Sequence, residues 1–137
     1  MSKMIFINMP VADLPKAKAF YEAIGARNNP QFTNETAACM VVSETIHVML
    51  LTHQKWGSFT KKPISDSRKA SEVMLALSYD SRVAVNAIVD AAGKAGGTAD
   101  VNPPQEHGFM FGRSFEDIDG HIWEAFWMDT SGMPAQG

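Results

Sequence analysis

The sequence predicts an α+β fold in which one pattern, a strand, a helix and three further strands, occurs twice in a single domain. Three observations lead to this prediction. Two apolar strands are each followed by a helix that ends at glycine, and each helix is followed by further short apolar runs. The chain of 137 residues with 45% hydrophobic content is also the size of one domain that can bury a core without disulfides.

The first copy of the pattern begins with an apolar strand at residues 4–9. Asp13 then begins a helix with Pro15 in its first turn, and Gly25 ends it. Three strands are expected after this helix, a weaker one at residues 31–33 and a hairpin at 37–42 and 46–51. We therefore predict a first module over about residues 4–52.

The second copy repeats this order. A strand is expected at residues 73–78, Ser81 begins a helix, and Gly96 with Gly97 ends it. The later strands are expected at residues 98–100 (weaker), 109–115 and 121–127. The predicted organisation is a single domain over 1–130, with a second module at about 71–128, a linker at 53–69 and a flexible tail at 131–137.

One carboxylate stands out in the last strand. Asp119-Gly120 suits a tight turn, and the alternation that follows places Ile122, Glu124 and Phe126 on one face. An ionised carboxylate in so apolar a strand is costly unless it is hydrogen-bonded, paired or bound to a cation. Glu124 is therefore the candidate catalytic or ligand-binding residue, with a structural role, held by an amide, an arginine or water, as the alternative.

Composition excludes several classes of protein. A net charge of −3 argues against a general nucleic-acid-binding protein, which needs a basic face. The lone Cys39 allows no internal disulfide, and the N-terminal apolar run is too short for a signal sequence or membrane span, so we expect a cytoplasmic protein. The expected partners are a small-molecule ligand and a second copy of the chain, not nucleic acid or membrane.

Two segments carry a resemblance to a known family. NMPVADLPKAKAFYEAIG (8–25) and SFEDIDGHIWEAFW (114–127) look like the opening and closing segments of the vicinal oxygen chelate superfamily, which includes glyoxalase I, fosfomycin-resistance enzymes and bleomycin-binding proteins. The resemblance covers about residues 4–128. It implies two βαβββ modules whose mixed sheets curve into one open cup, with the helices outside, and a homodimer as the assembly.

The resemblance also implies four metal-ligand positions, commonly histidine or glutamate. Carried over one at a time, they fall on Phe6, Leu50, Met74 and Glu124. One carboxylate with apolar side chains and a thioether is a poor site for a hard divalent cation. We therefore expect no cofactor and an apolar cup lined by these residues; a divalent metal at Glu124 is the alternative.

Further residues are candidates for this cup. Asn8 shares a strand face with Phe6 and could orient a polar ligand group or hydrogen-bond to Glu124. Arg113 shares the parity of three phenylalanines and could lie at the rim of the cup or pair with a carboxylate such as Glu124. The basic linker 53–69, with five Lys or Arg and one Asp, is either a solvated loop or a lid or dimer-contact segment that attracts an anionic ligand. A rearranged metal site that joins Glu124 to one of the loop histidines remains open, although spacing gives it no support. The loop histidines are His53 and His107, whereas His47 and His121 differ in parity from Leu50 and Glu124 and are expected to point to the opposite sheet face.

Two functional hypotheses follow, with a weaker third. The first is a metal-independent protein whose apolar cup binds a flat or hydrophobic small molecule. The second is a lyase or isomerase of the glyoxalase type, with Glu124 as general base or as the sole retained metal ligand. The third is a role in binding a protein partner through the same surface. No phosphate-binding loop, nucleophile elbow or dinucleotide motif is present in the sequence.

Overall fold

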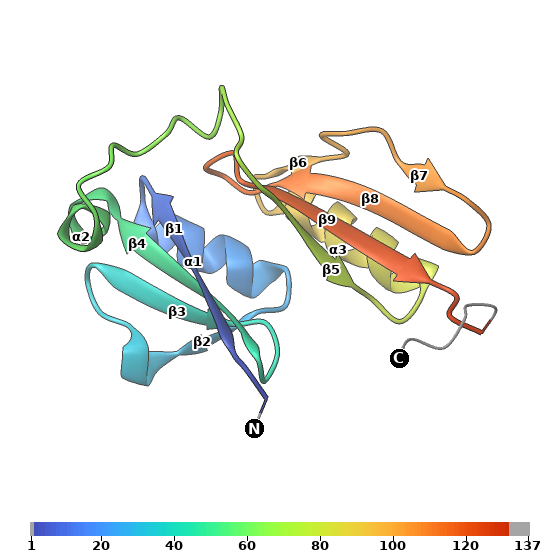
Figure 1. Cartoon of the computed structure of the whole chain (residues 1–137), viewed down its shortest axis with the longest axis horizontal. Coiled ribbons are helices and arrows are strands. Elements are labelled where there is room, and N and C mark those ends of the chain that lie inside the picture. Colours follow the sequence, from blue (N-terminus) through green and yellow to red (C-terminus); the bar gives the residue numbers. More distant parts are fainter. Residues whose placement is uncertain (1, 132–137) are drawn as a thin grey trace. The chain divides into compact units, whose positions relative to one another are not determined.

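The structure is a computed structural model that describes residues 2–131 (Figure 1). The chain divides into two compact units, Met1–Ala70 and Ser71–Gly137. Each unit holds one sheet and a helix that packs on one face of it. Among the helices of residues 2–131, none has the length and hydrophobicity that crossing a bilayer requires.

The first unit contains a four-stranded sheet in the order β1-β4-β3-β2. Strand β1 runs parallel to β4, whereas β3 is antiparallel to both β4 and β2. The elements of this unit are β1 (Ile5–Val11), α1 (Leu14–Ala23), β2 (Arg27–Asn29), the 3-10 turn η1 (Pro30–Phe32), β3 (Ala37–Val41), β4 (Ile46–Thr52) and α2 (His53–Phe59).

Helix α1 begins where the Asp13 side chain accepts a hydrogen bond from the Lys16 amide, a typical N-cap. Its apolar side buries Phe20 and Tyr21 against the sheet, and the Tyr21 hydroxyl donates to the Met9 sulfur at 3.7 Å. This contact shows that Met9 faces α1. Because neighbours along a strand alternate, the side chains of Phe6 and Asn8 lie on the opposite face.

The second unit repeats the same sheet order with β5-β9-β8-β6. Strand β7 pairs with residues 111–112 of β8, next to the part of β8 that pairs with β6. Strand β5 is parallel to β9, and β8 is antiparallel to β9. The elements are β5 (Met74–Ser78), α3 (Arg82–Lys94), β6 (Thr98–Ala99), β7 (Gln105–Glu106), β8 (Met110–Glu116) and β9 (Ile122–Met128).

Helix α3 covers one face of this sheet. The Ser81 hydroxyl caps it by accepting from the Ala84 amide, and Val85 and Val89 are fully buried. Phe115 and Trp123 lie directly opposite each other on β8 and β9, and each is 2% exposed. The core of the second unit therefore lies between α3 and this aromatic pair.

The predicted α+β fold with two strand-helix-strand-strand-strand modules is confirmed. The turn before the last strand forms with Gly120 at φ 94°, and Gly25 and Gly96 follow the two helices at φ 106° and 105°, which glycine adopts without strain. The joining of the two sheets into one cup stays a prediction.

The structure differs from the local predictions at three places. Residues 31–33 do not form a strand. The strand that follows α1 is β2 at 27–29, and a 3-10 turn that begins at Pro30 comes after it. The linker contains helix α2, capped by the Thr52 hydroxyl. Strand β7 was not predicted, because two residues are too short for a periodic signal. Apart from Ser131, the predicted tail lies outside the described residues.

Candidate functional site

The register of the second sheet separates two sets of side chains. Ala125 and Trp127 pair with Arg113 and Phe111 on the side of α3, as Trp123 does with Phe115. Glu124 pairs with Ser114 and Ala76, so its side chain lies on the face away from α3. The predicted alternation of this strand is therefore confirmed.

This face of the sheet contains a hollow of about 310 Å³, which lies entirely within the second unit. That volume is at the lower end of the range for small-molecule sites. Most of its lining is apolar or neutral, and Glu124 is its one acidic residue. The side chains on this face and in the adjoining segment are Met110, Ser114, Glu124, Phe126, Met128, Asn102, Pro103 and Gln105.

Gly112 lies in the middle of β8 on the floor of this pocket. It pairs with Phe126, so any side chain at this position would project from the pocket face. A Cβ built there would contact the Phe126 Cβ and the Ala125 carbonyl oxygen at 3.5 Å, an ordinary van der Waals distance. The backbone therefore tolerates a side chain here, and its absence keeps the floor open.

Glu124 is the unpaired charge of the pocket. The side chain is half-buried, and within residues 2–131 it forms no hydrogen bond or ion pair. Ser114, directly opposite, is occupied: its hydroxyl accepts from the Asn102 amide at 2.8 Å and donates to the Asn102 carbonyl at 3.2 Å. The Glu124 carboxylate is therefore available to a ligand that carries hydrogen-bond donors or positive charge.

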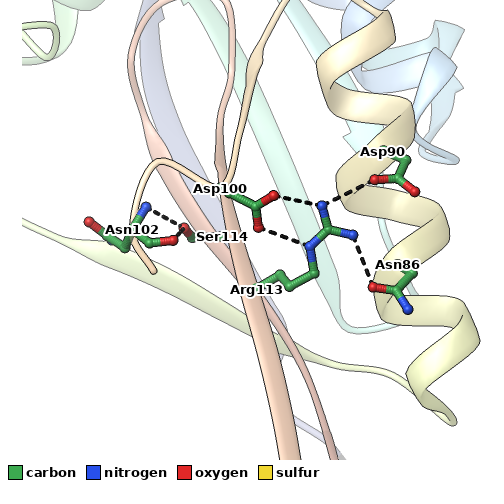
Figure 2. A network of polar contacts seen from close by, with 6 residues as sticks. All are labelled: Asn86, Asp90, Asp100, Asn102, Arg113 and Ser114. Atoms are coloured by element: carbon green, nitrogen blue, oxygen red, sulfur yellow. Dashed lines mark hydrogen bonds and ion pairs between the residues drawn. The ribbon is translucent and has the colours of Figure 1, made fainter. Parts of the chain in front are cut away.

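Arg113 is among the residues that line this pocket, and it pairs with a carboxylate as predicted, although that carboxylate belongs to Asp100 and not to Glu124. Its side chain lies on the α3 face and is 14% exposed. The guanidinium donates to both carboxylate oxygens of Asp100, at 2.9 and 2.7 Å, and reaches two residues of α3 (Figure 2). Those two residues are Asn86, an acceptor at 2.9 Å, and Asp90, an ion pair at 3.1 Å.

The hydrogen bonds from Arg113 hold the pKa of the Asp100 carboxyl group below its ordinary value, and Asp100 in turn raises the pKa of Arg113. Because the folded-state pKa of Asp100 is depressed, its stabilising contribution is complete above the unfolded value of about 3.9 and is lost as pH falls through the lower folded-state value. We expect Asp100→Asn to reduce the acid-induced loss of stability. Urea midpoints of both proteins between about pH 2.5 and 6 test this; parallel curves would contradict it.

In the first unit, Phe6 and Asn8 share a face, as predicted. Phe6 stacks on the His47 ring at a centroid distance of 4.5 Å and an interplanar angle of 14°, and it is 50% exposed. His47 was expected to point away from the ligand side, but the register pairs it with Phe6. Met49 pairs with Asn8 and belongs to the same face.

The site prediction for Leu50 was wrong. It pairs with Met9 on the α1 side of the sheet and is completely buried, so it belongs to the core. The two modules give the reason. Phe6 pairs with the residue two before Met49, and Met74 pairs with the residue two before Glu124. The first-module counterpart of Glu124 is therefore Met49, one residue away from the predicted position.

Met74 lies where it was predicted, on the same face as Glu124, and its sulfur contacts the Asn102 side-chain amide at 3.9 Å. Sequence reasoning missed Asn102, Gln105, Gly112 and Ser114. A glycine within a strand was a usable signal, because it often marks a close approach of backbone or ligand. The position of Asn102 depends on a loop, for which periodicity predicts nothing.

The donor set does not fit the divalent metal that the resemblance implies. With the corrected register the four positions hold Phe6, Met49, Met74 and Glu124, which offer one carboxylate and two thioethers. Hard cations require several oxygen or imidazole ligands. Within residues 2–131, no three side chains from His, Cys, Asp and Glu come together as a possible metal site.

Comparison with known proteins agrees with this fold. Hypothetical protein SA1046 from S. aureus is 24% identical, with 93% of this chain and 94% of that one covered and a TM-score of 0.77. A glyoxalase-related enzyme from Fulvimarina pelagi is 20% identical over 100% and 96% of the chains, with a TM-score of 0.78. Fosfomycin resistance protein FosX from Mesorhizobium loti is 19% identical over 93% and 90%, with a TM-score of 0.63.

At these identities the similarity to solved structures establishes the fold alone. A search of curated proteins found no match. The family model described as Glyoxalase/Bleomycin resistance protein/Dioxygenase superfamily matches residues 3–125, which is nearly the whole chain. The chain therefore belongs to the glyoxalase/bleomycin resistance protein/dioxygenase superfamily.

Proposed function

We propose that this protein is a metal-independent small-molecule-binding member of its superfamily, and that its ligand has a flat apolar body and a positively charged head. One observation carries the proposal: the Glu124 carboxylate lines a hollow of about 310 Å³ and has no partner within residues 2–131. A ligand amine would supply the charge and hydrogen bonds that this carboxylate lacks.

The residues that line the pocket support a ligand with an apolar body. Met110, Phe126 and Met128 present carbon and sulfur atoms, and Gly112 adds no side chain between them. Methionine side chains adapt to ligands of different outline, and aromatic rings stack on flat molecules. The predicted ligand contacts Phe6 and Asn8 belong to the first unit and remain predictions, as does the homodimer.

Three indole compounds with the same body and different heads provide a direct test. Tryptamine is cationic, indole-3-ethanol is neutral and indole-3-acetate is anionic at pH 7. We expect isothermal titration calorimetry to give the highest affinity for tryptamine and the lowest for indole-3-acetate. Glu124→Gln should weaken tryptamine binding roughly tenfold or more and remove the preference over the alcohol, because a charge-assisted hydrogen bond contributes about 1.5–3 kcal/mol.

Glu116→Gln is the matched control, because Glu116 lies on the same face of the sheet but outside the pocket. It should leave tryptamine affinity unchanged. Equal affinities for the three heads, or an equal loss in both variants, would contradict the proposal. Added divalent metal should not alter the affinities, and a metal requirement abolished by Glu124→Gln would support the enzyme hypothesis in its place.

The same unpaired carboxylate supports a second candidate, a lyase or isomerase of the glyoxalase type with Glu124 as general base. A base must lie within hydrogen-bond reach of the proton it removes, and the place of Glu124 in the lining of the pocket is compatible with that requirement for a carbonyl compound bound there. Exchange of deuterium from D₂O into the carbon next to the carbonyl of the glutathione–methylglyoxal adduct tests it. Glu124-dependent exchange supports the enzyme, and its absence favours the binding protein.

A further inference from the structure

The segment of residues 100–103, between β6 and β7, forms one wall of the pocket. Its first residue, Asp100, has φ 55°, a left-handed conformation that costs energy for any residue with a side chain. Such a conformation persists only where neighbouring contacts hold it. The chain turns here, so that Asp100 faces α3 whereas Asn102 and Pro103 reach the opposite face.

Contacts on both faces of β8 hold this segment (Figure 2). On the α3 side, Arg113 donates two hydrogen bonds to the Asp100 carboxylate. On the pocket side, Ser114 binds both the amide and the carbonyl of Asn102, and its own carbonyl accepts from the Asp100 amide at 2.7 Å. Arg113 and Ser114, two consecutive residues of β8, therefore hold the wall of the pocket from opposite faces of the sheet.

Asn102 is placed to contact a ligand. Its backbone groups are occupied by Ser114, but within residues 2–131 its side-chain amide has one weak contact, to the Met74 sulfur at 3.9 Å, and its side-chain oxygen accepts no hydrogen bond. A thioether is a weak acceptor, so a ligand group can replace it at little cost. The carboxamide thus offers both a donor and an acceptor in the wall of the pocket.

We propose that Arg113 is a positioning residue for this pocket: through its bidentate pair with Asp100, it holds Asn102 in the wall, where the carboxamide determines which ligands fit. The inference rests on the proposed function for its ligand and on the hydrogen-bond network for its geometry. The Arg113 guanidinium does not contact the ligand, because it lies on the α3 face, where it is bound to Asp100 and to α3. Arginine suits this role because its planar guanidinium group donates two parallel hydrogen bonds to a carboxylate, and the ammonium group of lysine does not.

Hydrogen exchange of the ligand-free protein tests the geometry. The amides of Asp100 and Asn102 both donate to Ser114, so they report on the wall directly. We expect Arg113→Met to accelerate exchange of these two amides while β8 and β9 stay protected. Arg82→Met is the control, because Arg82 forms a similar pair with Glu106 on the same face; it should affect residues 106–108 and leave the wall unchanged.

A double-mutant cycle with tryptamine tests the link to the ligand. Arg113→Met and Asn102→Ala should each raise the tryptamine Kd, by roughly tenfold, and the double variant should bind no worse than Asn102→Ala alone, since Arg113 acts through Asn102. Arg113→Lys should fall between wild type and Arg113→Met. Losses that multiply in the double variant, or unchanged exchange at residues 100 and 102, would overturn the inference.

Two outcomes separate this inference from the proposed function. If wild-type protein binds none of the three indoles, the proposed function fails, whereas exchange at residues 100 and 102 still decides whether Arg113 holds the wall. If tryptamine binds and depends on Glu124 but not on Arg113 or Asn102, the function stands and the inference fails. Should Arg113→Met not fold, Asp100→Asn and Arg113→Lys carry the same two measurements.

Discussion

Gly112→Val is expected to abolish tryptamine binding while leaving the protein folded and at least as stable as wild type. The valine side chain would project from the pocket floor between Met110 and Phe126, in the volume proposed for the ligand. The new Cβ meets its neighbours at 3.5 Å, so the backbone need not move. Valine is also favoured in strands, where glycine is not, and loses less conformational entropy on folding.

Titration with tryptamine and thermal denaturation measure the two effects separately. Gly112→Ala provides the matched, graded control, because one methyl group fills less of the hollow and should weaken binding only in part. A Gly112→Val protein that binds tryptamine as well as wild type does would show that the ligand site lies elsewhere. Loss of binding together with a large loss of stability would show that the substitution acts through the fold.

The second large effect is expected for stability. Trp123→Ala should lower the free energy of unfolding by about 3–5 kcal/mol, the range for removing a large buried aromatic side chain. Trp123 is 2% exposed and lies directly opposite Phe115 beneath α3. Its removal leaves a cavity at the centre of the core of the second unit, and the sheet around it relaxes only partially.

Urea denaturation of wild type and variant measures this loss. Phe109→Ala is the matched control, because Phe109 is an aromatic residue of the same unit that is 57% exposed, and its removal should change the stability by about 0.5 kcal/mol or less. Equal effects of the two substitutions would contradict the placement of Trp123 in the core. The loss of stability should appear without any change in the ligand preference of the protein that remains folded.

Strand alternation predicted the face of some side chains correctly and of others wrongly. The strand face of Glu124 was predicted correctly, because this residue lies in the middle of a long, regular strand that starts at a defined turn. The prediction placed Leu50 on the wrong face of the sheet. Side chains alternate along a strand, so an error of one residue in the alignment moves a side chain to the opposite face. Arg113 lies on the same face of β8 as Phe111 and Phe115, but alternation does not say which face is covered by the helix.

By itself, the sequence determined the two repeated modules, the helix ends at glycine, and the isolated acid of the last strand. These depend on local propensity and on periodicity, which act over a few residues. Only the tertiary structure decided which sheet face each helix covers, that Arg113 pairs with Asp100, and that Asn102 joins Glu124 around an open floor at Gly112. Those features arise from contacts between residues distant along the chain, for which no local pattern in the sequence exists.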